Sequence, residues 1–421
     1  MQLFGSNKNY LGVDLGTSSI KIVELQNRSE HAQLLTYGYV EQETDIIRAS
    51  SAAMETKIID IIKSVYKDSR MSSRKVNAAL PSFSVFNSII SLPVMNKKDL
   101  AQAVRWEAKK FIPLPIDEMV LDWKIIPEVA TNEKKHSLFE AKDKIKKEDL
   151  SESKLKETTI LSKTDNDLEK NTEEDKTNGD KEEGANNFSS IKKLLAKKKS
   201  LGNSKKDGKN LKILLTAAPK KLVEKYIRIF KAADLELINL ETESFALERS
   251  LAPNNFAPVM IIDIGSISSD VVIIDKGIPI LTRSIDIGGV TLTKSIMTSL
   301  NVDLARAEQF KRDIGFSSAG PGDLPETVKT VINPIINEIK YCLDIYLSQV
   351  GNNNKTLEKI ILTGGSAFLP DLTTYLSKLL DIKVIIGDPW DKIVYPLELK
   401  PVLQQLGPRF SVAIGLAMRE I

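Results

Sequence analysis

The stretch YLGVDLGTSSIKIVEL (residues 10–25) decides the fold, because a close copy of it returns as MIIDIGSISSDVVIID (residues 260–275). Each copy is an apolar strand that ends in Asp-x-Gly, passes through a turn of hydroxyl residues and leaves in a second apolar strand. A repeated unit is the strongest architectural signal that a single sequence offers. We therefore predict two related halves, each built around one β-hairpin.

The tip of each hairpin has the composition of a phosphate-binding turn. Gly16 in the first tip and Gly265 in the second would let the backbone approach an anion closely. Neighbouring amide and hydroxyl groups would donate to phosphate oxygens; they belong to Thr17, Ser18 and Ser19, and to Ser266, Ser268 and Ser269. One such tip is more often an ordinary β-turn, so the prediction depends on the matching strand context of the two copies.

Acidic residues end the first strand of each hairpin. Asp14 and Asp263 are expected at the carboxyl edge of a sheet, where a hydrated Mg²⁺ takes one or two carboxylates and completes its shell with phosphate oxygens and water. The copies differ where Lys21 aligns with Asp270. A cation there could contact phosphate and a carboxylate could orient water, or both could be outward strand positions. Asp14, Asp263 and Asp270 are thus the candidate catalytic residues, the first two also for Mg²⁺ through water.

A third glycine-containing turn follows both hairpins, in IILTGGSAFLPDL (360–372). Gly364 and Gly365 lie between an apolar strand and the start of a helix, and Ser366 follows them. Bare backbone near a helix N-terminus suits adenine or ribose. A Gly-Gly turn also commonly connects a strand to a helix without binding anything, so its place after the hairpins is what favours a nucleotide.

Composition excludes several classes of protein. The chain has 421 residues, a net charge of +3, one cysteine and two histidines. This is not the charge of a dedicated nucleic-acid binder, and it leaves no intrachain disulfide and little basis for a histidine triad or histidine metal site. Cys342 is expected in a helix core. No signal peptide or run of 18 apolar residues is present, so membrane association would come through a partner or a surface patch.

Residues 130–210 change character. Mixed charge and few large apolar residues predict disorder, because such a segment buries too little surface to offset its ordering entropy. Within it, SSIKKLLAKKKS (189–200) is basic and faintly amphipathic, which fits a solvated linker or a contact with acidic lipid or an acidic partner. Just before this segment, Asn96 is expected to cap a helix that ends before Pro113.

The order of motifs resembles the actin-like ATPase superfamily, with phosphate 1 at 12–21, phosphate 2 at 261–270 and the adenosine motif at 361–368. ETESFAL (241–247) and NPIINEIKYCLDIY (333–346) look like its two connecting helices. The resemblance implies an α/β, duplicated RNase H-like fold with ATP and Mg²⁺ in the central cleft. IGGVTLTKSI (287–296) looks like the segment after phosphate 2 in FtsA-type members, and it adds Gly288 and Gly289 to the nucleotide site.

A narrower resemblance is to the PilM family of type IV pilus assembly proteins. It rests on residues 79–126, above all RWEAKKFIPLP (105–115), on the stretch from LLTAAP onward and on FSVAIGLAMRE near the end. The family implies the FtsA-like arrangement 1A/1C/2A/2B. The expected boundaries are 1–81 for lobe 1, 82–234 for an inserted small subdomain 1C, 235–256 for a return to lobe 1 and 257–421 for lobe 2.

The same resemblance implies a function and a location. The chain would be an ATP-binding cytoplasmic scaffold at the cytoplasmic face of the inner membrane, held there by the cytoplasmic N-terminal tail of a PilN-like membrane protein. Other pilus assembly proteins and a second copy of the chain are further partners. The tail is expected between the small subdomain and its neighbour, and the residues proposed for its groove, which could equally be plain core, are Val85, Phe86, Val104 and Phe111.

Two departures and two alternatives qualify this interpretation. The charged insertion is long for the family, and the second tip, GSISSD, is poor in glycine, so we expect ATP binding with weak or no hydrolysis. A filament-forming ATPase like FtsA or MreB is one alternative, although no FtsA-like membrane helix follows FSVAIGLAMRE. A small-molecule kinase of the same fold is the other, although 79–126 shows no polar cluster for a sugar.

Overall fold

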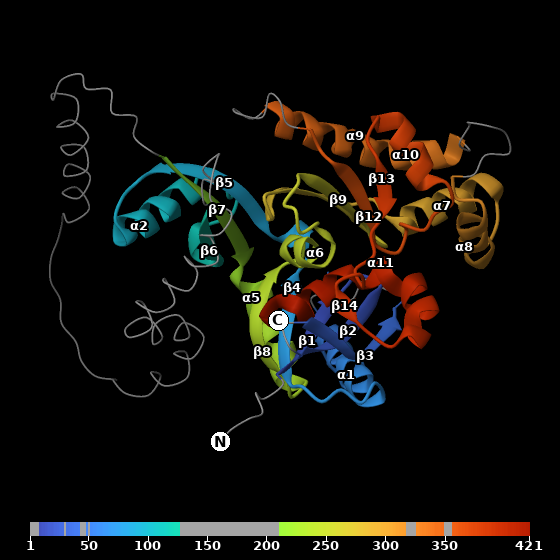
Figure 1. Cartoon of the computed structure of the whole chain (residues 1–421), viewed down its shortest axis with the longest axis horizontal. Coiled ribbons are helices and arrows are strands. Elements are labelled where there is room, and N and C mark those ends of the chain that lie inside the picture. The colour runs from blue at the N-terminus through green and yellow to red at the C-terminus, as the bar shows by residue number, and fades with distance from the viewer. Residues whose placement is uncertain are drawn as a thin grey trace, which may run out of the picture. The chain divides into compact units, whose positions relative to one another are not determined.

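The computed structural model describes residues 8–28, 31–42, 48, 51–126, 210–316, 326–348 and 356–421, with the side chains of 326–329 left out. The segment 130–210 that was expected to be disordered, with its basic piece 189–200, lies outside the described residues except for Asn210, which begins a strand. The described chain is an α/β structure with three sheets and helices packed against them (Figure 1).

Two of the sheets repeat one strand order. The first sheet runs β14-β3-β2-β1-β4-β8 and the second runs β11-β10-β9-β12-β13. In each, the first three consecutive strands form an antiparallel meander, and two more strands join parallel to its first strand. The strands of the first sheet are β1 (Asn9–Leu15), β2 (Ser19–Arg28), β3 (His31–Glu41), β4 (Lys75–Leu80), β8 (Glu236–Thr242) and β14 (Ile393–Val394). Those of the second are β9 (Val259–Ile264), β10 (Ser269–Asp275), β11 (Ile278–Ile285), β12 (Lys359–Thr363) and β13 (Val384–Ile386). This duplication is the one that the repeated hairpin predicted.

Helices cover both faces of the first sheet. On one face lie α1 (Ala52–Asp68) and α5 (Lys220–Ala232), whose apolar side chains share a core with alternate residues of β1 and β2. Against the other lie α6 (Glu243–Leu251) and α11 (Lys400–Ala417). Gly12 permits the close approach of α11, because a Cβ there would lie 1.9 Å from the carbonyl oxygen of Ala413.

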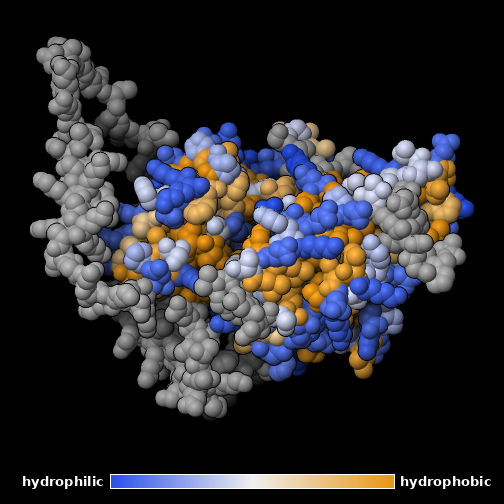
Figure 2. Space-filling view, turned by 90° about the horizontal axis from the view of Figure 1, so that it is seen from above, coloured by the Kyte–Doolittle hydropathy of each residue, from blue (hydrophilic) through white to orange (hydrophobic). Residues whose placement is uncertain are grey.

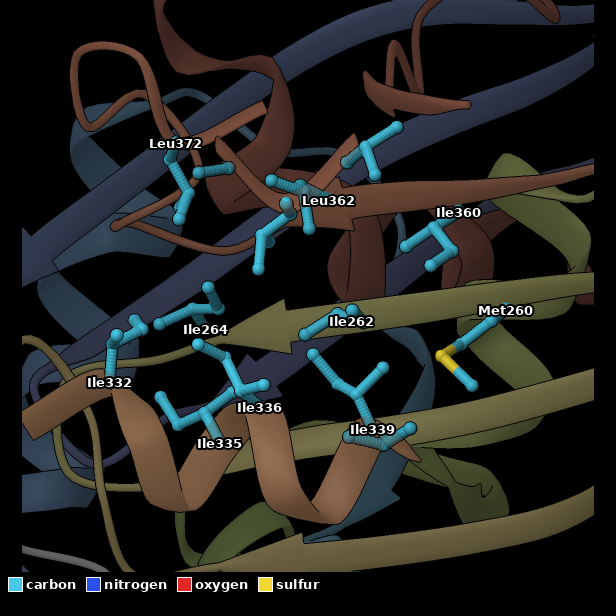
Figure 3. Close-up of a cluster of buried hydrophobic side chains, with 14 of the residues drawn as sticks. Met260, Ile262, Ile264, Ile332, Ile335, Ile336, Ile339, Ile360, Leu362 and Leu372 are labelled. Carbon is cyan, nitrogen blue, oxygen red and sulfur yellow. The ribbon is translucent and has the colours of Figure 1, made fainter. Parts of the chain in front are cut away.

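The second half has its own core, made by β9 and β12 with the helices α7 (Gly289–Leu300), α8 (Leu304–Asp313), α9 (Glu326–Ser348) and α10 (Leu372–Leu380). Figure 3 shows Ile335, Ile336 and Ile339 of α9 on the side of β9 that carries Ile262 and Ile264. The sequence prediction for Cys342 is confirmed, since it is buried in this core, where burial raises the pKa of its thiol to about 12.

The third sheet belongs to the inserted small subdomain, which follows a short 3-10 turn, η1 (Ser82–Ser84). Its strands β5 (Phe86–Pro93), β6 (Met119–Ile126) and β7 (Asn210–Pro219) are antiparallel in the order β5-β7-β6. Helix α2 (Lys97–Ala108) packs its buried stripe on them, and η2 (Ile116–Glu118) leads into β6. The predicted cap is confirmed, because the Asn96 side chain accepts a hydrogen bond from the Asp99 amide at 2.9 Å.

Packing sets different boundaries from those expected. Helix α5 lies within the expected small subdomain 82–234, yet Tyr226, Ile229 and Phe230 are buried in the core of the first half. The end of the expected second lobe also returns to the first half, where β14 joins the first sheet and α11 packs on β1. The short turns η3 (Leu397–Leu399) and η4 (Met418–Glu420) flank α11.

Candidate functional site

The two hairpin tips have the same backbone construction. The amide of Gly16 donates to the Ser19 carbonyl at 3.0 Å, and the amide of Gly265 donates to the Ser268 carbonyl at 3.0 Å. A Cβ on Gly16 or Gly265 would lie 2.9 or 2.8 Å from that carbonyl oxygen. Each tip therefore needs glycine to turn so tightly.

Each tip leaves amide groups free to bind an anion. In the first turn, the amides of Thr17 and Ser18 donate to no other described atom of the protein, and the same holds for Ser266 and Ile267 in the second. Successive backbone amides in a turn make a concave anion site. The tips are thus suited to phosphate oxygens.

One cavity of about 690 Å³ brings the two tips and the Gly-Gly turn together. Its size lies in the range of small-molecule sites, roughly 300–1,000 Å³. Of the predicted site residues, those that line it are Asp14, Gly16, Thr17, Ser18, Ser19, Lys21, Asp263, Gly265, Ser266, Ser268, Asp270, Gly289, Gly364, Gly365 and Ser366. Segments from both halves therefore meet at one cavity.

The register places the variable position of each hairpin opposite its strand-ending aspartate. Asp14 lies opposite Lys21, and the Lys21 ammonium donates to the Asp14 carboxylate at 2.8 Å, with both side chains largely buried. Asp263 lies opposite Asp270. The first hairpin thus neutralises its aspartate internally, while the second sets two carboxylates against each other.

A further carboxylate, which sequence reasoning missed and which is half-buried, lies beside this group. Glu243 is the first residue of α6, and its carboxylate accepts hydrogen bonds from the amide and hydroxyl of Ser82 at 2.8 and 2.7 Å. Burial, together with the negative charges of Asp270 and Asp14, raises the pKa of Glu243 to about 8. The sequence marked 241–247 as a connecting helix, but nothing local signalled that its glutamate would be buried beside the aspartates.

The aspartates of the second hairpin are perturbed in the same direction. Burial raises the pKa of Asp263 to about 7, Glu243 adds to the rise and Lys21 opposes it. Burial also raises the pKa of Asp270 to about 6, although the nearby hydroxyl of Ser284 acts to lower it. Asp270 Oδ1 is buried without a hydrogen-bond partner among the described residues. The site therefore holds more buried carboxylates than cations.

The carboxylates fit a hydrated cation better than a cation held by protein ligands alone. Within the described ranges, no cluster of three or more His, Cys, Asp or Glu residues is arranged to hold a metal ion. Mg²⁺ keeps several waters and binds through one or two carboxylates together with substrate phosphates. The surplus of carboxyl groups beside two phosphate-type turns fits that pattern.

The Gly-Gly turn packs directly on the second hairpin. Gly364 has φ +85°, and a Cβ on it would lie 2.3 Å from Asp263 Oδ1. The Ser366 amide donates to the Ile264 carbonyl at 3.2 Å. A Cβ on Gly365 would have no neighbour within 4 Å, so this residue presents bare backbone to the cavity.

Helix α7 supports the second tip from behind. The Gly289 amide donates to the Gly265 carbonyl at 3.0 Å, and the Val290 amide donates to the Ser266 carbonyl at 2.8 Å. Gly288 does not line the cavity, in contrast to the expectation that it contacts the nucleotide. A Cβ on it would lie 2.6 Å from the Ser266 carbonyl oxygen, so Gly288 is needed for the packing of helix against turn.

Helix α8 adds charged residues that the sequence interpretation also missed. Glu308, Lys311 and Arg312 line the same cavity, and the Lys311 ammonium donates to Glu308 at 2.7 Å and to the hydroxyl of Thr293 at 2.9 Å. Their spacing places them on adjacent positions of a helix surface. That spacing is a signal in the sequence, but it does not tell which cavity the helix borders.

The four residues expected to line the partner groove do not share one exposed surface. Val104 is 1 % exposed and belongs to the core of the small subdomain, where Phe86 also packs. Val85 packs against the core of the first half. Phe111 is 51 % exposed. The stripe that contains Val104 is therefore subdomain core, and Phe111 alone of the four reaches well into solvent.

None of the helices in the described part of the chain is long and apolar enough to cross a membrane.

Comparison with known proteins gives consistent matches. The family described as "Type IV pilus assembly protein PilM" matches residues 12–160 and 196–421. Cell division protein FtsA of Neisseria meningitidis serogroup B is 27 % identical over 177 residues, which span 38 % of this chain and 41 % of FtsA. The solved structure described as "PilM-PilN type IV pilus biogenesis complex" has a TM-score of 0.67 and 22 % identity, and the match covers 97 % of this chain and 98 % of that one. This structural likeness, with the duplicated strand order, confirms the actin-like fold expected from the sequence.

Proposed function

The chain belongs to the family of the type IV pilus assembly protein PilM, and from that premise we propose that it is an ATP-binding scaffold of such a machine. In this proposal ATP with Mg²⁺ occupies the cavity between the two hairpins. The nucleotide sets the relative position of the two halves and of the small subdomain, which binds the tail of a PilN-like membrane protein.

The main observation in favour of nucleotide binding is that three backbone turns line one cavity. The tips at Gly16 and Gly265 would hold the phosphates through free amides and hydroxyls. The bare backbone at Gly365 would lie against adenosine, with Lys311 and Arg312 of α8 beside it. A site for phosphate alone would need neither the Gly-Gly turn nor α8.

Mg²⁺ would supply positive charge next to the phosphates, and Asp14 and Asp263 would hold it through water. The chain itself contributes the positive charge of Lys21, which forms an ion pair with Asp14 within the first hairpin. Binding is expected to exceed hydrolysis. Burial and the charges of Asp270 and Asp14 raise the pKa of Glu243 to about 8 in the metal-free site, although its hydrogen bonds from Ser82 act to lower it, and we expect it to be a poor base for water there.

The partner proposal rests on the family and on the connection of the small subdomain to the site. The similar solved structure is described as a PilM-PilN complex. In the present chain, Ser82 of η1 starts the small subdomain and donates to Glu243 at the cavity. A change at the cavity would thus reach the start of the subdomain through one partly buried contact.

Calorimetry tests both parts of the proposal. We expect the full-length chain to bind ATP when Mg²⁺ is present, and Lys311→Ala to weaken binding about tenfold while Lys340→Ala, on the exposed side of α9, leaves it unchanged. A peptide from the cytoplasmic tail of the membrane protein should then bind the ATP-loaded chain. Absence of ATP binding would overturn the nucleotide site, and absence of peptide binding with ATP present would overturn the scaffold role.

A further inference from the structure

Helix α2 presents a basic outer stripe opposite the stripe that packs on the sheet. The inward residues Leu100, Val104 and Ala108 are buried. Four exposed polar residues follow one another at helical intervals on the opposite side, at i, i+4, i+7 and i+11; they are Lys98, Gln102, Arg105 and Lys109. Trp106 lies next to this stripe. We call Lys98, Arg105, Trp106 and Lys109 the outer face of α2.

Trp106 is unusually exposed for its size. It is 64 % exposed, whereas Trp390 is 1 % exposed in the core beneath α11. The ammonium of Lys110 lies 4.6 Å from the centre of the Trp106 ring. Exposed apolar side chains also stand at both ends of the helix, since Val94 is 62 % and Phe111 51 % exposed. Figure 2 shows that apolar side chains reach the surface among hydrophilic ones elsewhere too, so the feature that singles out α2 is its combination with lysine.

The charge of this helix is positive and only partly neutralised. Arg105 pairs with Asp117 at 2.5 Å, and Lys110 pairs with Glu107 at 2.8 Å. Lys97, Lys98 and Lys109 are exposed and form no ion pair with another described residue. Lys98 and Lys109 belong to the outer face and are therefore available to an anionic partner beside Trp106.

We propose that the outer face of α2 binds directly to a membrane surface that contains anionic lipid. Tryptophan prefers the depth of the lipid headgroups, where its ring is apolar and its N–H remains wet. Lysine and arginine beside it are attracted to anionic headgroups. The cores of protein–protein interfaces are enriched in tryptophan but depleted in lysine, so the lysines favour a lipid surface over a protein partner.

The geometry requires contact with the surface rather than insertion. Helix α2 has 12 residues, and its inner side is committed to the subdomain core. A helix of this length cannot span a bilayer, which needs about 20 apolar residues. The contact goes beyond the proposed function, in which a membrane protein's tail supplies the attachment, and it does not depend on nucleotide or tail binding.

Vesicle flotation with the full-length chain tests the proposal. The probes are vesicles of phosphatidylcholine alone and vesicles of two parts phosphatidylcholine to one part phosphatidylglycerol. We expect binding to the anionic vesicles only. Lys98→Gln combined with Lys109→Gln should weaken it at least tenfold, because each cation contributes about a fivefold gain near an anionic surface. The matched pair Lys57→Gln with Lys63→Gln on the exposed side of α1 should leave binding unchanged.

Tryptophan provides a second readout. Trp106→Ser should weaken binding, whereas Leu397→Ser, at the most exposed of the large apolar side chains described, should not. The fluorescence emission of the wild-type chain should shift to the blue on anionic vesicles, and Trp106→Phe should abolish that shift while the other two tryptophans remain.

Three results would overturn the proposal. One is equal binding to neutral and anionic vesicles, and another is full binding by the Lys98/Lys109 double variant. The third is a Trp106 emission shift that follows addition of the tail peptide and not of vesicles, which would assign the face to a protein partner. Since every substituted side chain is exposed, unchanged thermal unfolding of the variants would show that folding is not the cause of any loss.

Discussion

The two hairpins have nearly the same backbone but opposite electrostatics. Both turn on a glycine whose amide donates to the carbonyl three residues on, and both place one residue directly opposite the strand-ending aspartate. In the first hairpin that residue is Lys21, which pairs with Asp14. In the second it is Asp270, which opposes Asp263. The two copies thus share the turn but differ in charge, as the proposal of different contacts with one nucleotide requires.

The physical reason for the difference lies in burial. A buried ion pair offsets part of its own desolvation, whereas two buried carboxylates do not, so they retain protons instead. The pKa values of Asp263 and Asp270 are raised accordingly. In the proposed function, Lys21 of the first hairpin would contact phosphate and the carboxylates of the second would receive the cation that accompanies the nucleotide.

Removing the cation of the first hairpin should have the largest effect. Lys21→Met leaves Asp14 buried without its partner, and breaking a buried pair costs about 3–5 kcal/mol. We expect that loss in the free energy of urea unfolding, with loss of ATP binding in calorimetry. Lys57→Met on the exposed side of α1 is the control. A Lys21→Met protein that binds ATP normally would contradict the different roles assigned to the hairpins.

The raised pKa values of Glu243 on α6 and Asp263 in the second hairpin predict an unusual pH dependence of stability for the nucleotide-free protein. Unfolded carboxyls lose their protons near pH 4, but Glu243 and Asp263 retain theirs up to about pH 8 and 7 when folded. The folded state then binds more protons between these limits, so the free energy of unfolding should fall as pH rises from about 5 to 8. We expect a fall of roughly 2 kcal/mol or more, since one pKa unit is worth about 1.4 kcal/mol.

Urea unfolding at a series of pH values, without Mg²⁺, measures this dependence. Glu243→Gln should reduce it to the part that Asp263 contributes, because glutamine keeps the hydrogen bonds from Ser82 but carries no proton to lose. Stability that rises over the same pH range would show that the carboxylates are ionised in the folded protein.

Removing one of the two facing carboxylates of the second hairpin should have a smaller effect, and it should stabilise the protein. Asp270→Asn removes one of the two facing charges, so we expect the nucleotide-free protein to gain about 1 kcal/mol at pH 8 and little at pH 5. Thermal unfolding at the two pH values checks this expectation, with Asp60→Asn on α1 as the control. An equal effect at both pH values would mean that charge is not the cause.

The smallest effect concerns the contact between the site and the small subdomain. Ser82→Ala removes one hydrogen bond to Glu243 at 2.7 Å and should cost about 1 kcal/mol of stability. ATP affinity should change less than threefold, whereas the ratio of tail-peptide affinities with and without ATP should move toward one. An unchanged ratio would contradict the proposed coupling of the second hairpin to the subdomain through Glu243. Ser84→Ala in the same turn serves as the matched control.

The sequence was informative wherever the cause of a structure lies within a few residues. The two Asp-x-Gly turns, the Gly-Gly turn and the Asn96 cap each depend on backbone conformation and hydrogen bonds between near neighbours, so their patterns could be read directly. The duplicated strand order followed from the repetition of the first of these patterns. By contrast, Val104 lies on an apolar stripe that would look the same whether it faced a core or a groove.

The pair of matched turns, the positions of their aspartates and the difference between Lys21 and Asp270 can all be read from the order of residues alone. Only the tertiary structure decided that Glu243 is buried against those aspartates, that α8 borders their cavity, and that α5 and α11 pack on the first half. A turn is fixed by short-range hydrogen bonds and sterics, whereas burial and the pKa of a carboxylate depend on segments that meet only when distant parts of the chain pack together.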